Sequence, residues 1–162
     1  MTPNIKRAEE LIKENAKNQD TFLDLGNLGL TALPEALFEL THLKRLNLGF
    51  SYTKLNEKGK RERVSSQNDF LPNSLKDLSD RLSELVALEY LRFSNNWYVR
   101  NDFQNSYGSL FKKNNLGNQI KNLPLLENLR ELDLSYNQIT KIENLEPLAN
   151  LNSLDLSYNQ IT

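Results

Sequence analysis

Two segments near the end of the chain are almost identical and begin 22 residues apart, LRELDLSYNQIT at Leu129 and LNSLDLSYNQIT at Leu151. Both fit the pattern L-x-x-L-x-L-x-x-N-x-L/I, which is one of the most specific repeat signatures that a single sequence can carry. The L-x-L part alternates like a strand, so both of its leucines point to the same side. Such a unit buries its leucines by packing against copies of itself, which predicts short parallel strands stacked along an elongated solenoid.

Three earlier copies follow the same template and begin near Phe22, Leu43 and Leu88, so the sequence predicts about five repeats. The stacked strands should line a concave face, and the helices or irregular turns that connect them should form the convex face. The predicted fold class is therefore α/β, with one short strand and one return segment in each repeat.

The asparagine of each repeat turns the chain out of the strand, and its amide can bond the backbone of adjacent turns. Asn96, Asn137 and Asn159 occupy this position in the last three repeats. The first two repeats have Leu28 and Ser51 there instead. We therefore expect a ladder of stacked asparagines to begin only at the third repeat.

The two ends of the predicted solenoid differ. Residues 1–20 carry an apolar stripe at helical spacing, which predicts an amphipathic helix that caps the first repeat. Residues 21–162 form the repeats, and the last repeat stops in mid-unit at Thr162. An uncovered end exposes apolar surface, so we expect the chain to be a fragment truncated at its C-terminus. The members of the apolar stripe are Ile5, Ala8, Leu11 and Ile12.

Two insertions interrupt the repeats, near residues 54–70 and 99–117. The second repeat spans 45 residues before the third begins, and the third spans 41 residues. Both insertions leave at the same repeat position, so they should emerge side by side on one edge of the solenoid. The lengthened return segment of the second repeat also predicts an amphipathic helix through Leu75, Leu78, Leu82 and Leu85.

The first insertion is basic and the second is aromatic, a combination that could bind nucleic acid. The first has about five cations, interrupted by glutamates, so a solvated charged loop is the favoured interpretation. The aromatic residues of the second insertion are then expected to pack that insertion down. The residues concerned are Lys54, Lys58, Lys60, Arg61 and Arg63 in the first insertion, and Trp97, Tyr98, Arg100, Phe103, Tyr107 and Phe111 in the second.

Two segments of the sequence resemble those of known protein families. The segment LDLGNLGLTALPEALFELTHLKRLNLG is similar to the opening repeats of bacterial cytoplasmic leucine-rich-repeat proteins. The helix with AEELIKEN, followed by FLDLGN, resembles the start of Roco-type proteins, in which the repeats precede a Ras-like GTPase domain and a dimerising domain. The resemblance implies a leucine-rich-repeat fold, protein binding and intramolecular regulation. It places no catalytic residue in this segment.

Composition excludes several other classes. The chain has no cysteine and one histidine, which excludes zinc sites and Cys–His pairs, and it has no G-x-x-x-x-G-K-[ST] phosphate loop. We therefore expect no enzyme activity and no cofactor in this segment. The formal net charge of −1 disfavours nucleic acid and anionic membranes as partners. The sequence shows no signal peptide or membrane span, so we expect a soluble, cytoplasmic protein.

The alternation of each strand leaves side chains on the concave face that the core does not need. Aromatic residues and arginine are enriched among interface hot spots, so we predict that a protein or peptide lies across this face. Asp133 and Asp155 occupy equivalent positions because the repeats copy one another, which explains them better than acid–base chemistry does. The predicted partner-binding residues are Phe22, Asp24, Arg45, Asn47, Phe50, Tyr90, Arg92, Glu131, Asp133, Tyr136, Asp155 and Tyr158.

Overall fold

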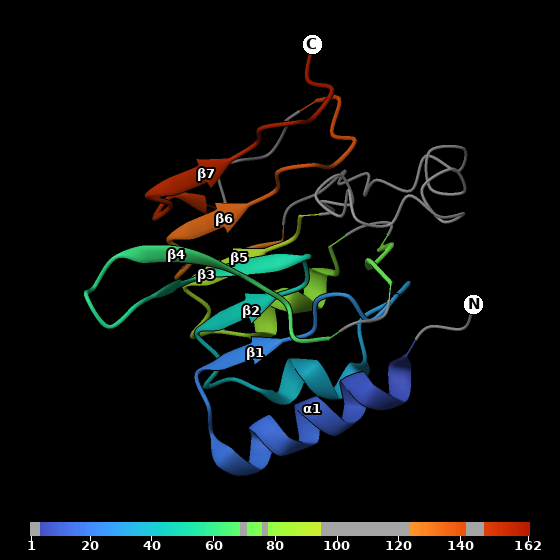
Figure 1. Ribbon diagram of the computed structural model, residues 1–162. Coiled ribbons are helices and arrows are strands. Elements are labelled where there is room, and N and C mark those ends of the chain that lie inside the picture. The colour runs from blue at the N-terminus through green and yellow to red at the C-terminus, as the bar shows by residue number, and fades with distance from the viewer. Residues whose placement is uncertain (1–3, 69–70, 76–77, 95–123, 142–147) are drawn as a thin grey trace, which may run out of the picture.

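The computed structural model describes residues 4–68, 71–75, 78–94, 124–141 and 148–162 (Figure 1). Five short parallel strands form one sheet, in the order β1-β2-β5-β6-β7. The central leucine of each strand is aligned with that of its neighbour, for example Leu46 with Leu91 and Leu132 with Leu154. The predicted parallel stacking is confirmed, and the architecture is an α/β repeat fold. The strands are β1 (Phe22–Asp24), β2 (Arg45–Asn47), β5 (Tyr90–Arg92), β6 (Glu131–Asp133) and β7 (Ser153–Asp155).

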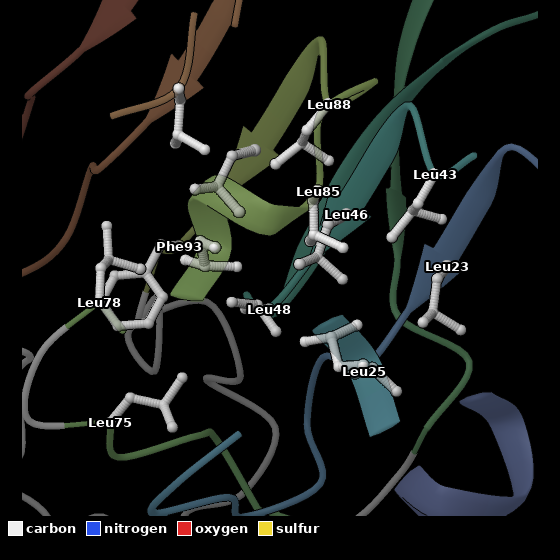
Figure 2. Packing of buried hydrophobic residues seen from close by; sticks show 14 of the residues in the cluster. Leu23, Leu25, Leu43, Leu46, Leu48, Leu75, Leu78, Leu85, Leu88 and Phe93 are labelled. Atoms are coloured by element: carbon white, nitrogen blue, oxygen red, sulfur yellow. The ribbon is translucent and has the colours of Figure 1, made fainter. Parts of the chain in front are cut away.

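The hydrophobic core lies on one side of this sheet. It is made almost entirely of the periodic leucines, and Leu25, Leu46 and Leu85 are among those that pack there (Figure 2). Two short 3-10 helices, η1 (Glu35–Glu39) and η2 (Asp80–Glu84), belong to the return segments that face the sheet across this core. Because the core takes one face of the sheet, the opposite face, which we call the outer face, is left for other contacts.

The amphipathic helix predicted through Leu75 and Leu85 is wrong. Residues 71–75 and 78–79 are not helical, and only the five residues of η2 turn as a 3-10 helix. Ser79 has extended backbone angles and its side chain accepts a hydrogen bond from the Arg81 N–H, which starts the helix at Asp80. Leu75 and Leu78 are buried nonetheless, because an extended return segment can also direct leucines toward the sheet.

The helix α1 (Ile5–Asn18) lies against β1 and η1 at the start of the sheet (Figure 1). It buries Ala8 and Ile12 in the core. Its buried Asn15 donates from Nδ2 to the carbonyls of Asp20 and Phe22, both at 3.0 Å. The helix is therefore joined to the first strand by apolar packing and by a buried amide.

The asparagine ladder begins one repeat earlier than the sequence predicts. Asn73, not Ser51, fills the position in the second repeat: its Nδ2 donates to the carbonyls of Leu25 and Leu48, each at 2.8 Å. Asn159 makes the equivalent bonds to Leu134 and Leu156, each at 2.9 Å. Residues 51–72 are therefore a 22-residue insertion between Phe50 and Asn73, and the repeat continues normally after it.

The first part of this insertion is a β-hairpin rather than an irregular loop, and its five basic side chains are exposed, as the expected solvated segment requires. Strands β3 (Ser51–Leu55) and β4 (Arg61–Ser65) pair antiparallel along their full length. Their turn is closed by the Asn56 side chain, which accepts from the Lys58 and Lys60 N–H groups at 3.0 Å, and Gly59 supplies a positive φ of 69°. The hairpin leaves the stack at the turn after β2, where the Ser66 N–H bonds the Phe50 carbonyl, and it then runs across the outer face of the sheet (Figure 1). That the two insertions emerge side by side stays a prediction. The second insertion, 99–117, lies outside the described residues.

Candidate functional site

The middle column of the outer face holds the residues between the two leucines of each strand. These side chains bend back to hold the turn after their own strand: Asp133 Oδ1 accepts from the Ser135 N–H at 3.0 Å, and Asp155 accepts from the Ser157 N–H at 2.9 Å. Asp24 does the same for Gly26. An Asp or Asn followed two residues later by Gly or Ser is a known turn-forming spacing. These Asp side chains, which the sequence predicted to bind a partner, therefore also have a structural role in the turns.

The same column is linked across the strands. Asn47 Nδ2 donates to Asp24 Oδ1 at 2.8 Å, and Arg92 forms an ion pair with Asp133. Asn47 and Arg92 have exposed fractions of 0% and 1%, and Tyr90 beside them has 7%. The expectation that these three side chains lie at the surface is wrong, because the hairpin covers this part of the sheet.

Three contacts fix the hairpin on the sheet. The Tyr52 ring lies on Phe22 of β1, with their centroids 4.7 Å apart. Arg45 of β2 donates to the carbonyl of Thr53 in β3. At the far end, Arg61 of β4 donates to both carboxylate oxygens of Glu131 in β6, at 3.0 and 2.6 Å.

Arg45 also lies between two aromatic rings of the outer face. Its guanidinium carbon is 4.7 Å from the Tyr90 centroid and 5.8 Å from the Phe22 centroid. A guanidinium at this distance over a ring is attracted by the ring quadrupole. Phe22, Arg45 and Tyr90, all predicted to bind a partner, are therefore brought together, but with the hairpin above them.

The base of the hairpin is held by the turn after β1. Ser66 Oγ donates to Asp24 Oδ1 at 3.1 Å, and Asn68 Nδ2 donates to the carbonyls of Asp24 and Gly26 at 3.0 Å. Neither Ser66 nor Asn68 stands out in the sequence as part of this face. The alternation on either side of Asn56–Gly59 is the signal that could have predicted a hairpin, although not its position.

An aromatic pair lies beyond the hairpin, on the turns that follow β6 and β7. Tyr136 and Tyr158 are stacked, with ring centroids 4.2 Å apart and an interplanar angle of 11°. Burial, and then a hydrogen bond with Tyr158, raises the pKa of Tyr136 above its ordinary value. Tyr158 is 71% exposed.

Both tyrosines have a backbone φ of 57°, and Asn27, which occupies the same position in the first repeat, has 51°. This left-handed region suits asparagine and is uncommon for a bulky side chain. The remaining predicted residues lie between these extremes: Phe50, Glu131, Asp133 and Asp155 are half-buried.

A family model described as leucine-rich repeats (2 copies) matches residues 127–162, the segment that holds β6, β7 and both tyrosines. The chain contains leucine-rich repeats. No curated protein matches the chain. Leucine-rich repeats are a non-catalytic module that commonly mediates protein–protein interaction.

The matched leucine-rich repeats are also those whose outer face the hairpin leaves most open. Ser153 and Tyr158 in the last repeat are exposed, whereas Asn47 and Arg92 in the earlier repeats are buried. In the part of the chain that the structure describes, no group of three or more His, Cys, Asp or Glu side chains could hold a metal ion. Across those same residues, none of the helices combines the length and the apolar character that crossing a membrane requires.

Proposed function

We propose that the chain binds a protein or peptide on the outer face of its sheet, and that the primary contact is the Tyr136–Tyr158 pair. In this proposal the repeats form a curved solenoid whose concave side is the outer face. The observation that carries it is that two stacked aromatic rings stand in left-handed backbone positions, with Tyr158 largely exposed.

The left-handed backbone conformation of the two tyrosines is not explained by a contribution of their rings to the hydrophobic core. A non-glycine residue in the left-handed region costs on the order of 1 kcal/mol or more, and such positions cluster at functional sites. The hydrophobic core of the described residues is built from leucines and does not include either ring. Tyrosine is one of the residues enriched at the centre of protein interfaces, because it has a large apolar ring and a polar hydroxyl.

The charges around the pair suit a polar rim. Asp155 and Arg63 both lie close enough to affect the ionisation of Tyr136, one with negative and one with positive charge. An aromatic centre surrounded by mixed charge is the usual anatomy of a protein interface. The proposed ligand is therefore a segment that places an apolar side chain on the two rings and polar groups around them.

The experiment uses a photo-crosslinking amino acid in place of Tyr158 to capture the partner, and then titration calorimetry with that partner after purification. Tyr158→Ala should weaken binding by about tenfold or more, because removing an interface hot spot costs about 2 kcal/mol. Val86→Ala is the matched control, since Val86 is also exposed but lies on a return segment away from the pair. Equal affinities for the two variants would refute the proposal.

Two alternatives have less support. A regulatory arm of a Roco-type GTPase, or a particular location such as the cytoplasm, rests on the sequence resemblance and composition alone. Nucleic-acid binding would use the five cations of the first insertion, and two of them are already engaged, Lys54 with Glu62 and Arg61 with Glu131. We therefore propose the protein-binding function.

A further inference from the structure

The fold does not depend on the β3–β4 hairpin. Of the described residues, none between 51 and 65 belongs to the hydrophobic core cluster. Asn73 restores the repeat after the insertion, with the same bonds that Asn159 makes in a repeat without one. The hairpin can therefore leave the sheet without opening the leucine core.

The contacts that hold the hairpin are those of a bound peptide. An aromatic ring lies on an aromatic ring, at Tyr52 and Phe22; a backbone carbonyl accepts from a side chain of the sheet, at Thr53 and Arg45; and an arginine pairs with a carboxylate, at Arg61 and Glu131. The Arg61–Glu131 pair is exposed, and exposed ion pairs are weak.

The surface beneath the hairpin does not match it fully. Arg92 Nε and Nη2 and the Tyr90 hydroxyl are buried and have no hydrogen-bond partner among the described residues. Ser51 Oγ at the start of β3 is in the same state. Buried polar groups without partners disfavour the state that buries them. Lifting the hairpin would expose these groups to water or to a better ligand.

We propose that the hairpin is an internal ligand of the outer face of β1, β2, β5 and β6, and that a partner protein replaces it there with an extended segment carrying an aromatic and an arginine residue. This inference rests on the proposed function, because it takes the outer face as the binding surface. The aromatic residue of the partner takes the place of Tyr52 on Phe22. Its arginine takes the place of Arg61 on Glu131.

The hairpin can pivot at its base. Ser66 and Asn68 remain bonded to the turn after β1, while Ser51 and Ser65 form the first pair of the two strands. Movement about this base carries the tip away from β6 and uncovers Asn47, Tyr90 and Arg92. The closed hairpin thus competes with the partner. The apparent affinity for the partner is the intrinsic affinity multiplied by the fraction of molecules in which the hairpin is open.

The first test measures this opening in the full chain. Because the chain has no cysteine, Lys58→Cys at the hairpin turn and Glu127→Cys near β6 can each take a spin label. The distance between them is recorded by electron–electron resonance. In the double variant, Tyr52→Ala removes the ring contact and Arg61→Glu places a second carboxylate opposite Glu131. Each change should raise the open population about fivefold, and the two together about 25-fold.

Two controls make the result specific. Adding Glu131→Arg to the double variant re-forms the ion pair with opposite polarity. This third change should lower the open population about fivefold relative to the double variant. Lys44→Glu breaks another exposed ion pair, that of Lys44 and Glu89 just before β2 and β5, and should leave the distances unchanged. If the double variant keeps the distances of the parent chain, the hairpin is a fixed part of the surface and the proposal is wrong.

The second test supplies the hairpin as a separate molecule. A peptide of residues 50–66 is titrated into the full chain and into a variant that lacks residues 51–72, in which Phe50 is joined to Asn73. The peptide should bind the deletion variant at least about tenfold more tightly, because the internal hairpin blocks the site in the full chain. The same peptide with the Arg61→Glu change should bind about fivefold more weakly.

Equal binding to both chains, with the sheet of the deletion variant retained by circular dichroism, would overturn the proposal. If the deletion variant does not fold, the spin-label distances decide it. Neither test uses the natural partner or Tyr158. A negative result here therefore leaves the proposed function to be judged on its own experiment.

Discussion

Replacing Asn73 with alanine should destabilise the chain far more than its place directly after an insertion suggests. Its Nδ2 donates to the carbonyls of Leu25 and Leu48, and its Oδ1 accepts from the N–H groups of Leu28 and Leu30 at 3.2 and 2.9 Å. All four bonds are to the backbone, and Asn73 is buried. Alanine leaves these four backbone groups without the amide that joins the first repeat to the second.

The magnitude follows from the four bonds. A hydrogen bond contributes about 1 kcal/mol net, and a buried group left unpaired costs about 1–3 kcal/mol. Some of the groups will regain water where the turn relaxes, so we expect a loss of about 3–5 kcal/mol in the free energy of unfolding. For a chain of this size, 1 kcal/mol corresponds to about 2–4 °C, so Tm should fall by roughly 6–20 °C.

Urea unfolding monitored by circular dichroism measures this loss, with two matched controls. Asn128→Ala removes one exposed amide bond to the Val86 carbonyl and should cost about 1 kcal/mol or less. Ser51→Ala changes the residue that simple counting places in the ladder, and should be nearly neutral because Ser51 Oγ has no partner among the described residues. If Asn73→Ala costs no more than Asn128→Ala, the ladder assignment is incorrect.

Two further predictions concern the turns after the strands. Gly26→Ala should cost about 3 kcal/mol or more in urea unfolding, because its new Cβ would lie 1.9 Å from the Gly49 carbonyl oxygen, a backbone atom that cannot move aside alone. Tyr158→Phe should lower the pKa of Tyr136 toward its ordinary value in an ultraviolet titration, because it removes the hydroxyl with which Tyr136 is hydrogen-bonded, although burial keeps part of the shift. An unchanged titration in the variant would show that Tyr158 does not contribute to this pKa shift. Since the folded-state pKa of Tyr136 is above the unfolded value of about 10, this group stabilises the folded state at pH values below about 10. That stabilisation is lost as the pH rises through the folded-state pKa.

The strands and their order were predictable from the leucines alone. Leu23, Leu46, Leu91, Leu132 and Leu154 lie at the centres of the five strands, because only the L-x-L alternation buries two side chains from so short a segment. The return segments were less predictable. Leucines three and four residues apart occur in a helix and also in an extended segment that follows the core, so the spacing of Leu75 and Leu78 did not decide between them.

The open part of the candidate site was predictable for the same reason, and the covered part was not. Tyr136 and Tyr158 follow from their repeat position. The burial of Asn47, Tyr90 and Arg92 depends on where the hairpin lies, and that is set by contacts between residues far apart in sequence, such as Arg61 with Glu131. Counting from Leu48 also misplaced the ladder residue, since the insertion separates Phe50 from Asn73.

An insertion at this turn changes the outer face without disturbing the core. The entry and exit of the hairpin are joined by the Ser66 N–H and the Phe50 carbonyl at 2.9 Å, and the chain re-enters the stack where the Ser74 N–H bonds the Leu30 carbonyl at 2.8 Å. Phe50 and Asn73 therefore occupy consecutive positions of the repeat, although 22 residues separate them in the sequence. The contacts of the hairpin with the strands extend from Phe22 on β1 to Glu131 on β6, and the outer face at β7 lies beyond them. Under the proposed function, Tyr158, on the turn after β7, is consequently where a ligand would bind before the hairpin has moved.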